Sequence, residues 1–407
     1  MKRLFVVGAS VLQLPAIKKA KEMGLYVAAA DFNLNAAGIP YADEFFEVST
    51  IDEVGICQAA KEFKADGIMT LATDMPMRSV AYTCEKLGLR GISYETAVKT
   101  TDKGKMIQAF EEFGVAHPWY FIISETAQLS DIKEKITYPC ISKPVDNAGS
   151  RGVTLINQRS ELEDAFLYSS ANGRGGQVII EEYLQGDEVS VEIIAVDGKI
   201  NVLQVTDKLT TGAPHFVEMG HSQPSRLGDH AVDEIKKLAI KAVESVGIEN
   251  GPAHVEIMMT DSGPKMIELG ARMGGDCIAT HLVPLSTGID MVKASILIAL
   301  GETPDVSPKF CKGSAIRYFD DRNGVIQSVS GVEDAEKIPG VREIILTKGQ
   351  GDTVGEITSS TDRIGAVIAQ GEDAVCAGEV CRSAEKKVKI NYKIEKTLWE
   401  KTSKNRG

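Results

Sequence analysis

The sequence lacks the cysteine patterns of a disulfide framework or a structural zinc site. Its seven cysteines are scattered, no two of them form a Cys-x-x-Cys pair, and their number is odd. Both kinds of site need cysteines in pairs at short, regular spacing. We therefore expect buried thiols and a reducing, cytoplasmic location.

Long apolar runs and an excess of basic charge are also missing. No run approaches the roughly 18 apolar residues that a helix needs to cross a bilayer, and residues 1–8 enter a strand without the apolar core of a signal peptide. The formal net charge of -12 disfavours non-specific binding to nucleic acid or anionic membranes. We expect neither nucleic acid nor a membrane among the partners, although a local basic pocket for phosphates stays compatible with this charge.

The two familiar glycine-rich phosphate motifs are incomplete. The segment 8–13 keeps only the first glycine of G-x-G-x-x-G, which favours a tight turn between a strand and a helix. The loop 146–152 lacks the G-K-[ST] ending and the following helix of a Walker A motif. Its small residues would let backbone N–H groups converge on phosphate oxygens, and Lys143 could neutralise the same charge. Most such loops are only turns, so the loop alone decides nothing.

What the sequence does contain is a regular alternation of expected strands and helices. Strands at 4–7 and 26–30 flank a helix at 15–24, and the pattern continues to about residue 100. This alternation predicts a parallel sheet covered by helices. After residue 304 short strands dominate, which indicates a separate small α+β unit. The 407 residues leave room for roughly three domains of mixed α/β and α+β class.

The segment 254–276 predicts a hairpin with two opposed glutamates. The turn residues 261–264 separate two runs of strand-forming residues. If the chain folds about Ser262, Glu256 lies directly opposite Glu268, and both share the polar face with His254. The expected apolar face consists of Val255, Ile257, Met259, Ile267 and Leu269.

Two glutamates that face each other across a hairpin are destabilising unless something uses them. Oxygen ligands of this kind suit a hard cation such as Mg²⁺, which commonly binds one or two carboxylates together with substrate phosphates. The alternative is a solvated face that carries two glutamates by chance. The complete apolar face, and Arg272 on the polar side, favour a platform for metal and phosphate.

Lys103 and an acidic cluster each allow two interpretations. Thr101 is expected to cap a helix over 103–113, and a lysine in its first turn opposes the helix dipole. Lys103 is therefore either aimed at a ligand or solvated. The acidic residues of 181–188 follow a buried apolar strand, so they either face a ligand or are solvated. The Gly/Pro-rich loop 211–224 is long enough to be a functional lid.

Several motifs carry a resemblance to a known family when they are taken in chain order. They are Gly8 to Gly24, Asp31, Ala42-Asp43, Asp102-Lys103, Ile141-Ser-Lys143-Pro144, Gly149-Ser-Arg-Gly152, Glu181-Glu-Tyr-Leu184, Glu188, Glu256, Glu268 and Arg272. The ordered set resembles the ATP-grasp superfamily along the whole chain. The branch is the biotin-carboxylase/carbamoyl-phosphate-synthase-like one, and within it the carboxylate–amine ligases of the L-amino-acid type.

The resemblance implies a fold in three parts. Residues 1–100 would form a Rossmann-like pre-ATP-grasp domain with a parallel βαβ pattern. Residues 101–304 would form the central two-lobed ATP-grasp fold, with 115–190 as its small lobe. Residues 305–407 would form a small C-terminal α+β unit that completes the large lobe.

The resemblance also implies a role for each matching residue. The residues that bind ATP would be Lys103, Lys143, Gly149, Ser150, Gly152, Glu181, Glu182, Leu184 and Glu188. The metal ligands would be Glu256 and Glu268, the catalytic residue Arg272, and the substrate-binding residues His221, Gly274 and Gly275. Arg272 would stabilise an acyl-phosphate and the tetrahedral intermediate.

The cofactors implied are ATP with one or two Mg²⁺ ions, for which Mn²⁺ could substitute. Many members of the family have an asparagine at the position of Gly270, where it serves as a third metal ligand. Because this chain has glycine there, a second ion would depend on Glu268 and phosphates.

The function implied is an ATP-dependent carboxylate–amine ligase. It would form an amide or peptide bond through an acyl-phosphate and release ADP and phosphate. One alternative is an ATP-dependent carboxylase or a carbamoyl-phosphate-synthase-like enzyme, although the longer glycine loop of biotin carboxylase is missing. A non-catalytic ATP-binding regulatory protein is a third, and Glu256, Glu268 and Arg272 argue against it. The expected partners are a small-molecule carboxylate and amine, with a homodimer as the candidate assembly.

Overall fold

The computed structural model describes residues 1–147, 149, 151–213, 215–320 and 324–393. The chain divides into two compact units, Met1–Asp207 with Pro224–Cys311 and Lys208–Gln223 with Lys312–Gly407. This division is coarser than the three expected domains, whose limits near residues 100 and 304 remain a prediction.

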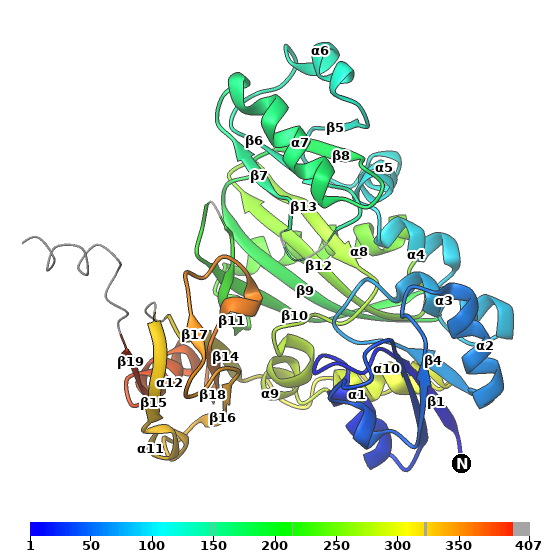
Figure 1. The fold of residues 1–407 in the computed structure, drawn as a ribbon, viewed down its shortest axis with the longest axis vertical. Helices are drawn as coiled ribbons and strands as arrows, with labels where there is room; N and C mark the ends of the chain where they lie inside the picture. Colours follow the sequence, from blue (N-terminus) through cyan, green and yellow to red (C-terminus); the bar gives the residue numbers. More distant parts are fainter. Residues whose placement is uncertain (148, 150, 214, 321–323, 394–407) are drawn as a thin grey trace, which may run out of the picture. The chain divides into compact units, whose positions relative to one another are not determined.

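The first unit begins with the parallel sheet that the alternating pattern predicts (Figure 1). Its strand order is β3-β2-β1-β4, and all three pairings are parallel. The strands are β1 (Arg3–Val7), β2 (Tyr26–Asp31), β3 (Glu44–Glu47) and β4 (Gly67–Met69). The helices of this region are α1 (Leu14–Glu22), α2 (Glu53–Phe63), α3 (Met77–Leu87) and α4 (Tyr94–Thr100). Residues 4–7 are all buried, as expected for a parallel sheet under helices.

A four-stranded antiparallel sheet lies inside the segment expected to be the small lobe (Figure 1). Its order is β5-β8-β6-β7. The strands are β5 (Tyr120–Ile123), β6 (Cys140–Pro144), β7 (Thr154–Ile156) and β8 (Val178–Glu182), and the helices are α6 (Leu129–Ile132) and α7 (Leu162–Asn172). Phe166 of α7 packs with Ile156 and Ile180 in one hydrophobic core. This core fixes the ends of β6 and β8, which carry Lys143 and Glu181.

The larger antiparallel sheet of the first unit has the order β13-β12-β9-β10. Its strands are β9 (Asp187–Val196), β10 (Lys199–Thr210, of which residues up to 207 belong to this unit), β12 (Gly251–Thr260) and β13 (Gly263–Gly270). Helices α5 (Lys103–Phe113) and α8 (Asp229–Val246) pack against it. Val191, Val255 and Phe110 meet in this core, so the opposite faces of β9 and β12 are left for polar side chains.

The first unit ends with three short helical segments. They are a π-helix at Ile278–Leu282, α9 (Val283–Thr287) and α10 (Met291–Ala299). In the described part of the chain no single helix is long and apolar enough to cross a membrane. The bent pair Ile278–Thr287 and Met291–Ala299 reaches that length and composition only when the two are taken together.

The second unit contains two antiparallel sheets. The first has the order β11-β14-β18-β16, with β11 (Glu218–Gln223), β14 (Gly313–Tyr318), β16 (Val341–Leu346) and β18 (Gly365–Gly371). The second has the order β17-β15-β19, with β15 (Gly324–Ser330), β17 (Thr353–Val354) and β19 (Lys389–Lys393). The helices are α11 (Val332–Glu336) and α12 (Ala374–Glu385), and Cys381 of α12 packs with Ala315 and Val367. The α+β character predicted for this segment is confirmed.

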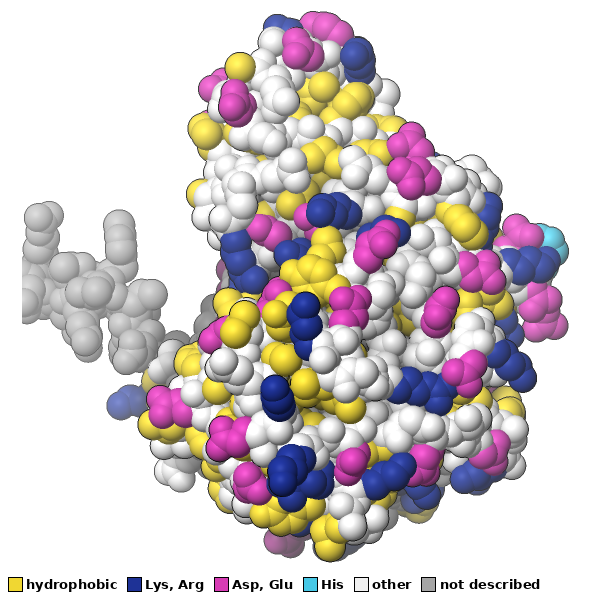
Figure 2. Space-filling model, turned by 90° about the vertical axis from the view of Figure 1, so that its right-hand side faces the viewer, with side chains coloured by type: hydrophobic (Ala, Val, Ile, Leu, Met, Phe, Trp, Pro, Cys, Tyr) yellow, Lys and Arg dark blue, Asp and Glu magenta, His cyan; other side chains and the backbone are white. Residues whose placement is uncertain are grey.

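On the face that Figure 2 shows, acidic and basic side chains are interspersed. Among the described residues on this face, neither sign of charge forms a broad patch.

Candidate active site

The hairpin of β12 and β13 places Glu256 opposite Glu268, as predicted. The turn is tighter than expected, because Thr260 pairs with Gly263 and only two residues connect the strands. A register shift after Glu256 compensates, and the extra residue on β13 is Ile267. The bulge reverses the side-chain parity beyond it. Met266 is therefore buried in the core, whereas Ile267, expected on the apolar face, is only half-buried.

Lys103 is aimed at this hairpin. Its Nζ donates hydrogen bonds to Glu268 Oε1 at 2.9 Å and to the carbonyl oxygen of Asn147 at 2.8 Å. Burial alone would lower the pKa of Lys103, but the Glu268 carboxylate, with Asp74 and Glu256 further away, raises it above the ordinary value. The interpretation of Lys103 as a solvated side chain is therefore wrong.

The helix that presents Lys103 begins as predicted, but its cap is different. Asp102, rather than Thr101, caps α5, and its side chain accepts a hydrogen bond from the backbone N–H of Lys105. Thr101 follows α4 and accepts a hydrogen bond from Arg78 Nε at 2.7 Å. A carboxylate at the cap suits a helix whose first residue is cationic.

Lys143 lies at the end of β6 and forms a buried ion pair with Glu181 of β8. Nζ and Glu181 Oε1 are 2.6 Å apart, and the two side chains are 8% and 10% exposed. Glu182, the next residue, pairs with Lys265 Nζ at 2.7 Å. A narrow cavity brings Lys103, Lys143 and Glu181 together with apolar side chains. At about 10 Å³ the cavity is too small for a nucleotide as it stands, but its two cations beside apolar side chains offer the chemistry that phosphates and a base require.

The other described residues expected to bind ATP do not line this cavity, and one expected residue lies outside the described part. Leu184 is buried and Glu188 is half-buried at the start of β9. Gly149 is exposed, and Gly152 is packed so closely that a Cβ would lie 2.7 Å from Asn172. Ser150 lies outside the described residues, so its role remains a prediction.

Arg272 follows β13 and is held by a residue that the sequence does not single out. Its Nε and Nη2 donate to the two carboxylate oxygens of Asp74, at 3.0 and 3.1 Å. Burial alone would lower the pKa of the Arg272 guanidinium group, but the attraction and hydrogen bonds of the Asp74 carboxylate outweigh burial and raise this pKa. The signal in the sequence is weak: Asp74 follows strand β4 at the carboxyl edge of the parallel sheet, where ligand-contacting loops are found.

A buried histidine and a third glutamate support Glu256. His254 Nδ1 lies 2.8 Å from Glu192 Oε1, and its Nε2 lies 3.4 Å from Glu256 Oε1. Burial alone would lower the pKa of His254, but Glu192 and then Glu256 raise it to about 9. The imidazole is therefore charged at neutral pH and sits between two carboxylates. The sequence does not single out Glu192, because its partner is 62 residues away.

The substrate-binding residues expected from the resemblance divide between the two units. Gly274 packs so tightly that a Cβ would lie 2.7 Å from His254 Nδ1, whereas Gly275 has open space. His221 lies in β11 of the second unit, where it is buried and its carbonyl oxygen accepts a hydrogen bond from Arg317. Residues 218–223 of the expected lid 211–224 are therefore strand, and Pro214 lies outside the described residues.

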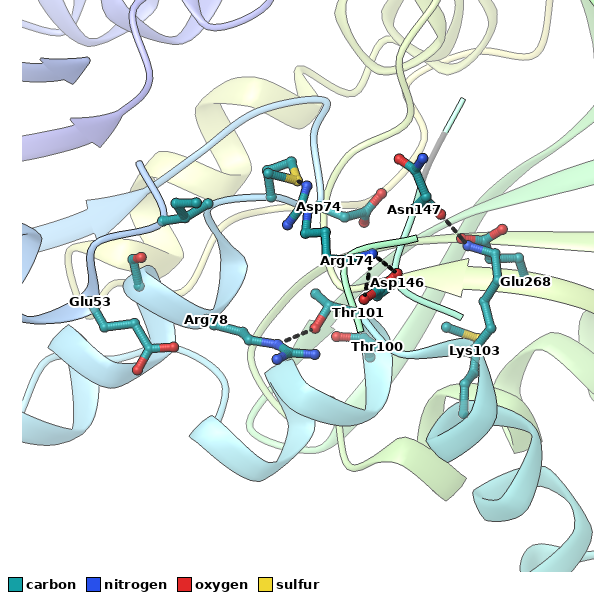
Figure 3. A pocket seen from close by; sticks show the side chains of 14 residues that line it. Glu53, Asp74, Arg78, Thr100, Thr101, Lys103, Asp146, Asn147, Arg174 and Glu268 are labelled. Carbon is teal, nitrogen blue, oxygen red and sulfur yellow. Dashed lines mark hydrogen bonds and ion pairs between the residues drawn. The ribbon is translucent and has the colours of Figure 1, made fainter. Parts of the chain in front are cut away.

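A cavity of about 280 Å³ adjoins these groups within the first unit. Lys103, Arg78 and Arg174 line it together with Asp74, Asp146 and Glu268. Figure 3 shows Lys103 and Glu268 on one side of the cavity and Arg78 and Glu53 on the other. Charges of both signs in one small cavity suit a ligand that itself carries both signs.

The donor set at the hairpin fits Mg²⁺. Glu256 and Glu268 supply only oxygen ligands, and each is held by a hydrogen-bonding cation, His254 or Lys103. In the described part of the chain no group of three or more His, Cys, Asp or Glu side chains is arranged to hold a metal. The ion would therefore rely on two carboxylates and on the phosphates of the nucleotide.

Comparison with known proteins identifies two regions of the chain. Residues 136–280 match the family model of the ATP-grasp domain, and residues 317–393 match that of the L-amino acid ligase C-terminal domain 2. The first match contains the hairpin with both glutamates and Arg272. The second lies in the second unit.

Individual relatives agree with these matches. The chain is 29% identical to the alanine–anticapsin ligase of Bacillus subtilis (strain 168) over 325 residues, 73% of this chain and 67% of that protein. It is 27% identical to the L-arginine-specific L-amino acid ligase of Bacillus subtilis over 286 residues, 67% of this chain and 68% of that protein. An L-amino acid ligase crystal structure from Bacillus licheniformis shares the fold, with a TM-score of 0.83 and 22% identity over 97% of this chain and 99% of that one. The chain therefore carries an ATP-grasp domain over residues 136–280 and the C-terminal domain of the L-amino acid ligases over residues 317–393.

Proposed function

We propose that this chain joins the carboxylate of one amino acid to the amine of another with ATP, through an acyl-phosphate, and releases ADP and phosphate. The observation that carries the proposal is the hairpin, where Glu256 and Glu268 are opposed and Lys103 and Arg272 lie on the same polar side. An ordinary structural hairpin would not collect two like charges together with two buried cations. The similarity to ligases of amino acids supports the choice of substrates.

The residues of the chain can be given roles in this reaction. Glu256 and Glu268 would hold Mg²⁺, and Lys103 and Lys143 would neutralise phosphate oxygens, exchanging their present carboxylate partners for the nucleotide. Bound ATP would supply the phosphoryl group that turns the substrate carboxylate into a better acyl donor. Arg272 would stabilise the negative charge that develops on the carbonyl oxygen as the amine nitrogen attacks. The new C–N bond forms, the C–O bond to phosphate breaks, and the nitrogen loses its proton.

The 280 Å³ cavity supports amino acids as the substrate class. Amino acids carry an ammonium and a carboxylate, and the cavity offers carboxylates such as Glu53 and guanidinium groups such as that of Arg78. Opposite charges in fixed positions orient a small zwitterion as well as bind it. Within this proposal, one or two Mg²⁺ ions, with Mn²⁺ as a substitute, serve the site.

Assembly and location complete the proposal. A homodimer and a reducing, cytoplasmic location are expected, and the second is supported by the seven cysteines, which form no disulfide with one another. The similarity to ligases of amino acids supports small molecules as partners.

The test is ADP release in the presence of Mg²⁺, measured over a panel of amino acids taken singly and in pairs, with mass spectrometry of the products. Release that needs two amino acids, and that matches a dipeptide in amount, is the expected result. Release that needs bicarbonate would favour the carboxylase alternative. Tight ATP binding with no release for any pair would favour a regulatory role.

A further inference from the structure

Asp74 lies in the loop between β4 and α3, far in sequence from the ATP-grasp motifs. Its bond to Arg272 is bidentate, and the two side chains are only 16% and 15% exposed. A bidentate pair fixes the plane of a guanidinium group as well as its position. The orientation of Arg272 therefore depends on a residue of the N-terminal parallel-sheet region.

The loop that presents Asp74 is itself held firmly. Gln13 Nε2 donates to the carbonyl oxygen of Leu71 at 2.7 Å, and the carbonyl oxygen of Asp74 accepts from the N–H of Met77 at 3.0 Å. Between them, Ala72 has a φ of 60°, in the left-handed region that residues with a Cβ rarely adopt. Backbone strain of this kind persists where the surroundings over-determine the conformation, and it is concentrated at functional sites.

Gly270 belongs to the same arrangement. Its φ lies outside the left-handed region, so the backbone does not require glycine there. The available space does require glycine, because a Cβ at this position would lie 2.5 Å from Asp74 Oδ1 and 3.1 Å from Arg272 Nε. Any side chain at position 270 would displace the Asp74 carboxylate, and with it the guanidinium group.

Arg272 also has competing partners. Besides Asp74, the carboxylates of Glu256 and Glu268 also attract the positive charge of Arg272, although more weakly. Without the two bonds from Asp74, the guanidinium group would be free to turn toward the glutamates that face it. Its position relative to the hairpin is thus set by Asp74.

We propose that Asp74 is a positioning residue for Arg272, and that Gly270 is glycine because it leaves the space that the Asp74 carboxylate occupies. This inference rests on the proposed function, in which Arg272 contacts the reacting groups. Asp74 lines the same cavity as Lys103 and Glu268 (Figure 3). The N-terminal region therefore contributes to catalysis through the orientation of one arginine.

The test is a double-mutant cycle of Asp74→Ala and Gly270→Ala. With an amino-acid pair that supports ADP release, each single variant should lower kcat about 10²-fold, the scale expected when a reacting group is misplaced by about 1 Å. The kcat of the double variant should be no lower than that of the less active single variant, because both changes disrupt the same Asp74–Arg272 arrangement. Losses that multiply to about 10⁴-fold would overturn the proposal, because independent sites behave additively.

Two further measurements separate positioning from a purely structural role. Affinity for a non-hydrolysable ATP analogue should stay at the wild-type value in Asp74→Ala, and Asp74→Asn, which keeps one acceptor oxygen, should recover part of kcat. Loss of affinity and of thermal stability with kcat intact would overturn the positioning role. Gly355→Ala, where a Cβ meets nothing within 4 Å, and Asp334→Asn, from an exposed pair with Lys337, are the matched controls.

Failure of the proposed function would be visible separately. If wild-type protein binds the analogue but releases ADP with no amino-acid pair, the ligase proposal fails. The same cycle read as midpoint of thermal unfolding then tests the Asp74–Gly270 arrangement. Non-additive shifts support it, and additive shifts overturn it.

Discussion

The β12–β13 hairpin and the small-lobe strands β6 and β8 balance their charges in opposite ways. In the hairpin, Glu256 and Glu268 face each other, and the partner of Glu268 is Lys103, which comes from helix α5. In the small lobe, Lys143 and Glu181 come from adjacent strands and neutralise each other at 2.6 Å. The two opposed glutamates of the hairpin are each held by a separate cation, Lys103 from α5 and His254 from β12 itself, whereas Lys143 and Glu181 neutralise each other directly.

This difference indicates which substitutions should affect turnover and which should affect the stability of the fold. Opposed like charges cost stability and are kept where a site needs them. A buried ion pair supports the fold in one particular sense, because removal of one partner leaves the other charge buried and uncompensated. Substitutions in the hairpin should therefore abolish turnover and spare the fold, and substitutions in the small-lobe pair should affect both.

The largest effect is expected from Glu268→Gln or Glu256→Gln. Each variant removes one of the two charges that would hold Mg²⁺, so ADP formation should fall to background. Relief of the repulsion across the hairpin opposes the loss of the ion pair with Lys103 or His254, so the midpoint of thermal unfolding should stay close to that of the wild type. A coupled assay for ADP and circular dichroism measure the two quantities.

Glu244→Gln, at an exposed position of α8, is the matched control for the loss of one carboxylate. If either hairpin variant turned over at the wild-type rate with the same Mg²⁺ dependence, the metal would have to lie elsewhere.

Arg272→Ala should be the next largest change. Loss of one donor that stabilises an oxyanion typically costs about 10²- to 10³-fold in kcat. Affinity for a non-hydrolysable ATP analogue should survive, because the nucleotide is held by other residues. Calorimetric titration measures the affinity for the ATP analogue, and amine-dependent ADP release measures the loss of kcat. Arg226→Ala, whose side chain is 72% exposed, controls for the loss of an arginine, and full activity of Arg272→Ala would exclude the catalytic role.

Lys143→Ala and Lys103→Ala sharpen the comparison directly. From the sequence, Lys143 has no obvious structural role, so its removal is expected to weaken ATP binding far more than it changes stability. The buried pair with Glu181 contradicts the premise of that expectation. Lys143→Ala should weaken binding of the ATP analogue and also destabilise the small lobe by about 3 kcal/mol, as for other broken buried pairs. Lys103→Ala should weaken binding with a smaller loss of stability, since Glu268 is 28% exposed.

Calorimetry and denaturant unfolding measure these two effects. The double variant Lys143→Ala/Glu181→Gln, which leaves no charge unpaired, should recover most of the stability but not the affinity. Equal loss of stability in Lys103→Ala and Lys143→Ala would break the comparison between the two regions.

The parts of the site that could be predicted are those set by local pattern. The helix at 103–113 and the pairing of Glu256 with Glu268 follow from periodicity and turn residues, and both are confirmed. Errors within one element are also local. Asp102 and Thr101 are adjacent cap formers, and the bulge at Ile267 depends on a turn one residue shorter than expected.

The parts that could not be predicted depend on contacts between distant segments. Asp74 reaches Arg272 across 198 positions, and Glu192 reaches His254 across 62. No local sequence pattern indicates such a contact, because the contact depends on how the sheets pack and not on the sequence around either residue. The family motifs name residues that are expected to contact ATP and metal, but not those that hold these residues in place.

The smallest effect is expected from the pH dependence of His254, the β12 cation beside Glu256. The pKa of this imidazole is raised from 6.5 to about 9, after Glu192 and Glu256 outweigh burial and the opposing charge of Arg272. A raised pKa in the folded state means that the stabilisation is complete below about pH 6.5 and is lost as the pH rises toward 9, by at most about 3 kcal/mol. Urea unfolding without metal or nucleotide, at pH 6, 7.5 and 9, should show this decline in the wild type. His254→Gln should flatten it, and His230→Gln, at an exposed position, should not. An equal slope in His254→Gln would show that the hairpin does not depend on a charged histidine.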